Sequence, residues 1–499
     1  MYFFKHLTDD LIKKHFSLAV SPKNSIFAPQ IKDKDLFYLG IINKCKNILK
    51  QIKRMKRICI LGAGMVSRPI IEHLLEKGFK VTVASNDLSK VDFIEQYPCG
   101  KRELFDVHNQ DQLSELVSEH DIIVSLLPYI FHIEVARQCI RHQKHLVTSS
   151  YVKPEMQALD KEARQSGIAL LNEMGLDPGI DHMSAMRIID YIHGQEGEVE
   201  EFYSLCGALP APESSHDNPF RYKFSWSPKG VVLAGNNSAV YKRKGTIVEI
   251  PTENLFKNVF TVDFPEVETL DVYPNRNSLE YIDIYKIPET KTIFRGTFRY
   301  HGWCESLDAF KRLQLTLPNQ EDMTGLTYAQ YLATKIKTNS TENLKQKTAT
   351  YLGLDINSTP VRSLEFLGFF EEKAMNRTYD SAYEITSDLM INTMMMQSHE
   401  RDMSVMQHNF IAKYKDGRRE MIVSRLLDFG IAHGDTSIAR TVALPAALAV
   451  ELLAEGSDII GVHRPVIPEI YHPVLNKLAD LGISMQETYG LDVKDMIDK

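Results

Sequence analysis

One stretch of the chain, residues 57–78, limits the possible folds more than any other. It is RICILGAGMVSRPIIEHLLEKG, with a short β-branched run, a glycine turn and an amphipathic pattern. The run is typical of a buried parallel strand, and the pattern after the glycines predicts a helix. A strand that enters a helix through Gly62-Ala63-Gly64 directs free backbone N–H groups and the positive helix end toward one point, which favours a phosphate. With Ser67 in the third small position, the GxGxxS turn predicts a dinucleotide-binding site.

The end of the next predicted strand, at 79–85, indicates which dinucleotide binds. Asn86 and Asp87 follow it, and Asp87 lies 23 residues after Gly64. A carboxylate at this place accepts hydrogen bonds from the ribose of NAD, whereas the 2′-phosphate of NADP favours Arg or Lys. No basic side chain follows until Lys90. The sequence therefore predicts NAD as the preferred cofactor, with NADP as the alternative, and it shows no spacing typical of a metal site.

Helical and strand patterns alternate from there to about residue 174. Such alternation predicts an α/β fold with a Rossmann-type, doubly wound parallel sheet. Ligands of such sheets lie beyond the carboxyl ends of the strands. We therefore expect five loops to face one crevice: 62–66, 85–87, 126–129, 149–151 and 175–179.

The last of these loops belongs to the stretch GLDPGIDH at 175–182. Asp-Pro-Gly is a good turn sequence, and Asp181 stands where an N-cap would begin the amphipathic run after it. Local chemistry alone thus favours a turn and a helix cap. The position of the stretch at a strand end favours a ligand-binding role for Asp177, while His182 is expected to pack in the core.

The composition of the whole chain excludes some classes of function. At 499 residues it suggests about three domains, and a net charge of −7 does not indicate nucleic-acid binding. No apolar run approaches the roughly 20 residues that span a bilayer. The six cysteines lack metal-site spacing and are typical of a reducing compartment, so we expect a cytoplasmic protein. The lysine-rich segment 1–54 has no signal-peptide features and is expected to be an appendage.

Several long strings resemble one family, the saccharopine dehydrogenases of the glutamate-forming type, also called saccharopine reductases. The resemblance runs from about Met55 to near the C-terminus. The strings are SLLPY (125–129), SSYVKPEMQALD (149–160), NEMGLDPGIDH (172–182), YSLCGALPAPESSHDNPFRYKFSWSPKGVV (203–232), YPNRNS (273–278), TIFRGTFRYHGW (292–303), HERDMSVMQHNF (399–410) and TVALPAALAVELL (441–453).

The resemblance implies a reversible, NAD(P)-dependent oxidation in lysine metabolism. Hydride leaves the carbon beside the secondary amine of saccharopine, and hydrolysis of the resulting imine gives glutamate and 2-aminoadipate 6-semialdehyde. It also implies a Rossmann domain (55–176, completed by about 440–499), a mixed α/β substrate or dimerisation domain (177–304 and about 398–439) and an inserted small helical domain (305–397). A homodimer is possible in such a family, and the Met394–Met396 run is expected to pack.

Site residues are carried over from the same resemblance. The candidates for acid–base catalysis are Tyr151, Asp177 and Cys206. The residues expected to bind the cofactor are Gly62, Ala63, Gly64, Met65, Val66, Ser85, Asn86, Asp87, Asp106, Val107, Leu127, Ser150, Tyr151, Leu176, Asp177, Pro178 and Ser227. Those expected to bind the substrate are Ser150, Tyr151, Asp177, Arg276, Thr297, Phe298 and Arg299, and a planar guanidinium suits a carboxylate.

Two other functions stay open at this point. A carboxynorspermidine-type dehydrogenase shares the DPG turn but has less need of a second arginine-bound carboxylate, so the strings YKFSWS, YPNR and GTFR favour saccharopine. A non-catalytic NAD-binding sensor is expected to lack strand-end polar groups, yet Tyr151, Asp177 and Arg276 are all present.

Overall fold

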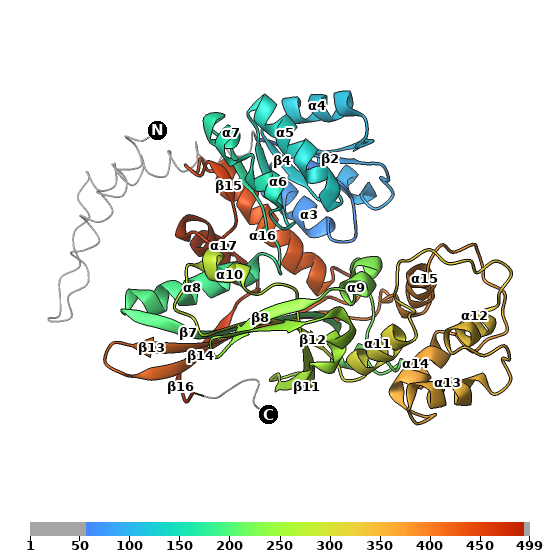
Figure 1. Ribbon diagram of the computed structural model, residues 1–499. Coiled ribbons are helices and arrows are strands. Elements are labelled where there is room, and N and C mark those ends of the chain that lie inside the picture. Colours follow the sequence, from blue (N-terminus) through green and yellow to red (C-terminus); the bar gives the residue numbers. More distant parts are fainter. Residues whose placement is uncertain (1–55, 494–499) are drawn as a thin grey trace, which may run out of the picture.

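The computed structural model describes residues 56–493, so the predicted appendage at 1–54 lies outside the described residues. A seven-stranded sheet, here called the parallel sheet, forms the upper part of the molecule in Figure 1, and all its neighbouring strands run parallel. Across the sheet the strands are β15 (Gly461–His463), β6 (Ala169–Leu171), β5 (His145–Thr148), β4 (Ile122–Ser125), β1 (Arg57–Leu61), β2 (Lys80–Ser85) and β3 (Gly100–Leu104).

Helices cover both faces of the parallel sheet, as the doubly wound prediction requires. Successive side chains along a strand point to opposite faces of the sheet and enter two different cores. The core on one face includes α3 and α16, and the core on the other face includes α4, α5 and the short helices after β5. The predicted Rossmann-type fold is therefore confirmed. The helices are α3 (Arg68–Glu76), α4 (Gln110–Glu119), α5 (His132–His142), α6 (Pro154–Gln157), α7 (Asp160–Gln165) and α16 (Ser437–Ala454).

A second, mixed sheet lies below the parallel sheet in Figure 1. Its pairs are antiparallel except β12 with β7, whose parallel register places Thr297 beside Cys206. Its strands are β10 (Phe260–Asp263), β11 (Thr269–Pro274), β12 (Thr292–Arg299), β7 (Gly197–Pro210), β13 (Asp402–Tyr414), β14 (Arg419–Phe429) and β16 (Gln486–Leu491), with β8 (Ala239–Arg243) and β9 (Thr246–Ile250) attached to β12.

The C-terminal segment, which is expected to complete the Rossmann domain, contributes strands to both sheets. β15 pairs with β6 in the parallel sheet, but β16 pairs with β14 in the mixed sheet. Between these two strands, α17 (Pro468–Asp480) packs against α8 (Ile180–Gly194). β16 covers part of the long strand β14, which would otherwise have an open edge.

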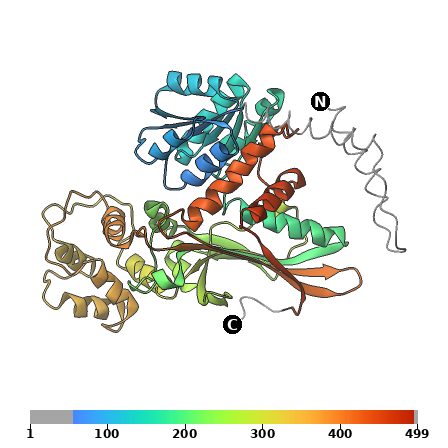
Figure 2. The ribbon, with the colours of Figure 1, turned by 180° about the vertical axis from the view of Figure 1, so that it is seen from behind.

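The remaining helices gather on the side of the mixed sheet and form the small helical region seen in Figures 1 and 2. Met394 is fully buried in the core of this region, as the packing interpretation of the methionine run predicted. The helices are α9 (Pro228–Ala234), α10 (Glu280–Tyr285), α11 (Trp303–Arg312), α12 (Tyr328–Lys335), α13 (Leu344–Leu352), α14 (Thr359–Phe366) and α15 (Ala382–Met394). Of these, α10 lies apart from the helical region and packs against α8, where its Tyr281 and Tyr285 contact His182.

Helix α16 joins the two sheets. It contacts α3, β4 and β5 on one side and β13 on the other (Figure 2). Its 18 residues have a mean hydropathy of 1.5, so by length and composition alone this helix could cross a membrane. Since 78% of the helix is buried inside the structure, its apolar surface is that of a core helix.

Candidate active site

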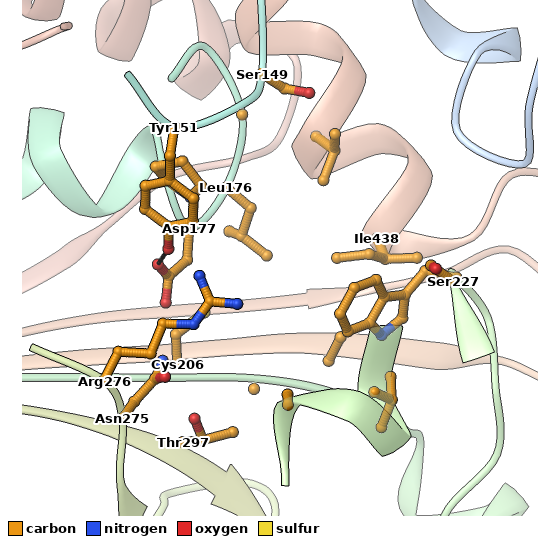
Figure 3. Close-up of a pocket in the computed structure, with 18 of the residues that line it drawn as sticks. Ser149, Tyr151, Leu176, Asp177, Cys206, Ser227, Asn275, Arg276, Thr297 and Ile438 are labelled. Atoms are coloured by element: carbon orange, nitrogen blue, oxygen red, sulfur yellow. Dashed lines mark hydrogen bonds between the residues drawn. The ribbon is translucent and has the colours of Figure 1, made fainter. Parts of the chain in front are cut away.

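A cavity of about 520 Å³ lies between the carboxyl end of the parallel sheet and the mixed sheet (Figure 3). The loops after β1, β5 and β6 line it from the parallel sheet. β7, β11 and β12 line it from the mixed sheet, and α9 and the first turn of α16 complete the wall. Three of the five loops predicted to face one crevice therefore do so. The loop after β4, which lies between β5 and β1, and the loop after β2 do not line the cavity.

The glycine turn after β1 leaves room for a phosphate. Gly62 has a φ of +101°, and a Cβ there would lie 3.2 Å from the backbone of Leu126. A Cβ on Gly64 would meet no atom within 4 Å. No side chain caps the start of α3 among residues 56–493. This open, uncapped helix start fits a dinucleotide pyrophosphate, and Met65 and Val66 continue from it into the cavity wall beside the buried Ala63.

Among the other residues expected to bind the cofactor, several follow β2 and β4, the two neighbours of β1, or β3, which lies beyond β2 at the same edge. The exposed carboxylate of Asp87 accepts hydrogen bonds from the backbone N–H and hydroxyl of Ser89, and these bonds lower its pKa. It thus presents a fixed negative charge at the end of β2, beside Ser85 and the exposed Asn86. Asp106, Val107 and Leu127 stand at the ends of β3 and β4, outside the lining of the cavity.

Ser150 was expected to bind the cofactor and the substrate, but it does not line the cavity. Its neighbour Ser149 lines the cavity instead. The Ser150 hydroxyl lies 2.8 Å from Nε2 of His132, whose Nδ1 lies 2.9 Å from the hydroxyl of Ser125. Burial lowers the pKa of His132 to about 4, so this imidazole is neutral and structural. The reason is the alternation of side chains at a strand end: one serine of the pair must turn into the core.

Asp177 holds a central position in the cavity wall. Tyr151 donates its hydroxyl to Oδ1 of Asp177 at 3.2 Å, and Figure 3 shows the two side chains meeting at the upper left of the cavity. The same carboxylate forms an ion pair with Arg295 behind it. Burial raises the pKa of Asp177 above its ordinary value, and the positive charge of Arg295 opposes that shift. Leu176 and Pro178 line the cavity on either side.

Asp181 and His182 have roles that differ from those expected. Gly179, not Asp181, is the N-cap of α8, and the fully buried Asp181 accepts a hydrogen bond from the Gly179 N–H. His182 is more than a packing residue: Nε2 lies 2.6 Å from the carboxylate of Glu173 and Nδ1 lies 2.9 Å from the hydroxyl of Tyr285. The chain therefore places a network of buried charges directly behind the DPG turn.

Cys206 and Tyr151 are both in the cavity wall, as predicted. Burial raises the pKa of the Cys206 thiol and that of the Tyr151 phenol well above their ordinary values. The nearby carboxylate of Asp177 raises both pKa values further. Both groups are therefore neutral near pH 7 and can donate a proton, but neither is set up as a base.

Arg276 reaches the cavity from the loop after β11. It is an exposed residue with a φ of 51°, and its guanidinium lies 5.7 Å from the centroid of the Tyr151 ring. In Figure 3 the side chain extends from the mixed sheet toward Asp177. No carboxylate of residues 56–493 pairs with it, so the predicted role as a carboxylate anchor fits its position.

Arg299 is the buried counterpart of Arg276. It is 5% exposed, and its guanidinium lies over the rings of Tyr222, Tyr273 and Trp303 at 5.1, 5.9 and 5.4 Å from their centroids. One N–H donates to the carbonyl of Phe298, but Nε has no partner, and within the described part of the chain no carboxylate pairs with this cation. An unpaired buried cation is costly, so the site favours an anionic ligand.

The alternation of strand β12 decides which of its predicted residues can touch a substrate. Thr297 and Arg299 line the cavity together with Ser227 at the start of α9, as predicted. Phe298 points to the other face of the sheet, where it is fully buried and packs edge-on against Phe264. The Phe298 side chain therefore does not line the cavity, unlike those of Thr297 and Arg299.

Two features of the site were missed by reasoning from the sequence. Arg295 belongs to the same string as Arg299, and strict alternation along 295, 297 and 299 was the signal that places all three on one face. Trp226 lines the cavity, and its indole N–H is buried. Its role could not be separated from packing in the sequence, because nothing local distinguishes the two.

Two family models match the chain along most of its length. The saccharopine dehydrogenase NADP binding domain matches residues 58–171, and the saccharopine dehydrogenase C-terminal domain matches residues 175–483. The first covers the parallel sheet up to β6, and the second begins at the DPG turn. The name of the first model specifies NADP, so it does not support the predicted preference for NAD.

Curated relatives and a solved structure agree with these matches. "Saccharopine dehydrogenase [NADP(+), L-glutamate-forming]" of Schizosaccharomyces pombe is 35% identical over 87% of this chain and 99% of its own length. The "Alpha-aminoadipic semialdehyde synthase, mitochondrial" of Bos taurus is 33% identical over 92% of this chain, which spans only 52% of that longer protein. The apo saccharopine dehydrogenase (L-Glu forming) of Saccharomyces cerevisiae has a TM-score of 0.80 at 33% identity and covers 87% of this chain and 99% of its own. The chain belongs to the saccharopine dehydrogenase family.

Proposed function

We propose that this protein oxidises saccharopine reversibly to L-glutamate and 2-aminoadipate 6-semialdehyde with a nicotinamide dinucleotide. One observation carries the proposal: the cavity brings Asp177 together with two arginines, Arg276 and Arg299, that have no carboxylate partner among residues 56–493, beside the open glycine turn. Saccharopine offers carboxylates to the arginines and a secondary amine to the aspartate. Family membership and the printed names of the fungal relatives support the same reaction.

The residues of the cavity suit the charges of this reaction. When bound, the nicotinamide supplies the acceptor for hydride. Arg299 in the buried wall and Arg276 nearer the solvent can hold carboxylates at two places, which fixes the substrate between them. The anionic Asp177 favours the cationic forms of the substrate nitrogen. Tyr151 and Cys206 are protonated, so they can donate hydrogen bonds or a proton to the carbinolamine oxygen.

The proposal is tested by NADH formation with the full chain. Saccharopine should be turned over, and carboxynorspermidine, which lacks the full set of carboxylates, should be a poor substrate. The products should be identified as glutamate and an aldehyde, because formation of NADH alone does not establish which bond is cleaved. Equal turnover of carboxynorspermidine, or binding of dinucleotide without turnover of either compound, would contradict the proposal.

We propose further that NAD is preferred over NADP, although the printed names of the fungal relatives specify NADP(+). The support is electrostatic: the ionised carboxylate of Asp87 stands at the end of β2, and hydrogen bonds from Ser89 hold it in place. A 2′-phosphate would meet this negative charge, whereas ribose hydroxyls can donate to it.

Replacing Asn86 with arginine and Asp87 with threonine is expected to move the preference toward NADP by about ten- to a hundredfold, the size of one charge-assisted hydrogen bond. The ratio of kcat/KM for the two cofactors measures the change. Asp87→Asn alone should weaken the discrimination without creating a preference for NADP, because it removes repulsion and adds no cation. A wild-type enzyme with the higher kcat/KM for NADP would show that a group other than Asp87 determines the cofactor preference.

A further inference from the structure

Arg295 stands directly behind Asp177, outside the lining of the cavity. Its side chain is only 4% exposed. One terminal N–H group forms the ion pair with Oδ1 of Asp177 and lies 3.6 Å from Oδ2 of Asp181. The other terminal N–H group donates to the hydroxyl of Tyr281 at 2.6 Å. One buried cation therefore stands between two buried carboxylates.

The backbone of Arg295 is fixed by the sheet. β12 pairs with β7 at this position, where Arg295 lies beside Ser204. The Arg295 N–H donates to the hydroxyl of Ser278 at 2.9 Å, and its carbonyl accepts the N–H of Asn275. The guanidinium also lies 4.2 Å from the centroid of the Tyr281 ring. The Tyr281 ring and the ion pair with Asp177 therefore both fix the position of the guanidinium. The ion pair has little freedom to rearrange.

Arg295 is the one arginine or lysine that contacts Asp177 among the residues that the structure describes. The titratable groups that face this carboxylate come from every element packed against it. They are Tyr151 after β5, Asp181 and His182 on α8, Cys206 on β7, Tyr281 and Tyr285 on α10, Arg295 on β12 and His408 on β13. Burial favours the neutral form of Asp177, Asp181 adds repulsion, and Arg295 is the largest opposing influence.

We propose that Arg295 is a positioning residue that keeps Asp177 ionised and holds its carboxylate toward the substrate nitrogen. It does so without touching the substrate, because the aspartate lies between it and the cavity. This inference rests on the proposed function, since the substrate amine is what the anion acts on. The ion pair alone could also serve to tie β12 to the DPG turn, and the test has to separate these two roles.

The first test is the pH dependence of kcat/KM for saccharopine in Arg295→Met, Arg295→Lys and the wild type. Loss of the positive charge raises the pKa of Asp177, so the acid limb should move to higher pH by about 1–3 units in Arg295→Met. Arg295→Lys restores the charge and should return the acid limb toward the wild-type position, within about one unit. Its kcat should stay reduced, because an ammonium cannot contact Asp177 and Tyr281 in the same way.

The second test measures the carboxyl group itself and needs no turnover. Infrared spectra of the unliganded protein are recorded across the same pH range for each Arg295 variant, with and without Asp177→Asn. In Arg295→Met a protonated carboxyl band should grow at a pH about 1–3 units higher than in the wild type, and Asp177→Asn should remove it. If the methionine variant does not fold, Arg295→Gln, which also lacks the charge, carries both measurements with the same expected shift.

Arg187→Met is the matched control. Arg187 lies on α8 and pairs with Glu487 of β16, so it also ties a helix to the mixed sheet but does not contact Asp177. Its loss should lower the melting temperature and leave both titrations in place. An Arg295→Met enzyme that loses stability with an unmoved acid limb and an unmoved carboxyl band would overturn the inference, and so would an Arg295→Gln enzyme with the same behaviour. A wild type that fails to oxidise saccharopine would instead reject the proposed function, and the infrared titration would still decide whether Arg295 controls Asp177.

Discussion

Arg299→Met is expected to lower kcat/KM for saccharopine by about a hundredfold, or about 2.7 kcal/mol, while the unliganded protein keeps or gains stability. The two effects have opposite signs because Arg299 has no carboxylate partner within residues 56–493. In the free protein only aromatic rings, and no carboxylate, offset the cost of burying this charge. In the complex the same charge meets a carboxylate of the substrate, and the cost becomes binding energy.

The surroundings of Arg299 support this reading of its charge. Two buried donors near it have no hydrogen-bond partner among the described residues: its own Nε and the indole N–H of Trp303. The Trp303 ring is also one over which the guanidinium lies. A native core rarely leaves several donors together without acceptors, unless a ligand supplies the acceptor.

Two other arginines serve as comparisons. Arg276→Ala removes the exposed anchor and should cost about ten- to a hundredfold in KM, with less effect on stability. Arg221 is the matched control, because it also lies over a ring, 4.4 Å from the centroid of Tyr300, but pairs with Glu268 of the chain itself. Arg221→Met should therefore lose stability and keep its KM. Calorimetry measures the change in stability of each variant, and steady-state kinetics measures the change in kcat/KM and KM. An Arg299→Met enzyme with unchanged KM would show that no substrate carboxylate reaches this pocket.

The sequence predicted the features that depend on local order along the chain. The glycine turn, the alternation of strands and helices, and the position of Asp177 at a strand end all follow from period and turn chemistry. These rules place Asp177 in the cavity although nothing in GLDPGIDH distinguishes a ligand site from a turn. The prediction depended on the parallel sheet, because ligands of such sheets bind at the carboxyl ends of the strands.

What the sequence did not predict depends on which way a side chain points and on which strands become neighbours. Ser149 and Ser150 differ only by one step of alternation, and so do Phe298 and Arg299. The role of Arg295 requires β12 to lie beside the DPG turn, a contact between residues 118 positions apart. Such a pairing is a property of the mixed sheet and leaves no local signal in either segment.

Asp177→Asn is expected to lower kcat/KM for saccharopine by at least about tenfold, the equivalent of one electrostatic contact of about 1.4 kcal/mol. Asparagine keeps the shape, the turn and the acceptor for the Tyr151 hydroxyl, but it deletes the charge. The substrate nitrogen gains positive character as hydride leaves the adjacent carbon, so the anion stabilises the transition state more than the neutral amine.

The charges behind Asp177 explain why this variant should remain folded. In the wild type one arginine, Arg295, faces two carboxylates, those of Asp177 and Asp181. Removal of one carboxylate leaves a pair of opposite charges rather than an isolated cation, so the substitution avoids the usual penalty for breaking a buried ion pair. Melting temperature and dinucleotide affinity should therefore change little, and the loss of rate can be assigned to the chemistry.

Asp181→Asn provides the matched control for this assignment. It deletes one charge from the same group of three, but Asp181 is fully buried and does not line the cavity. Its effect on kcat/KM should be clearly smaller than that of Asp177→Asn, because the lost charge does not face the substrate nitrogen. Equal losses in the two variants would mean that the total charge of the buried group matters and not its position. Near wild-type kinetics in a folded Asp177→Asn enzyme would reduce the DPG turn to a structural element, since asparagine supports the same turn.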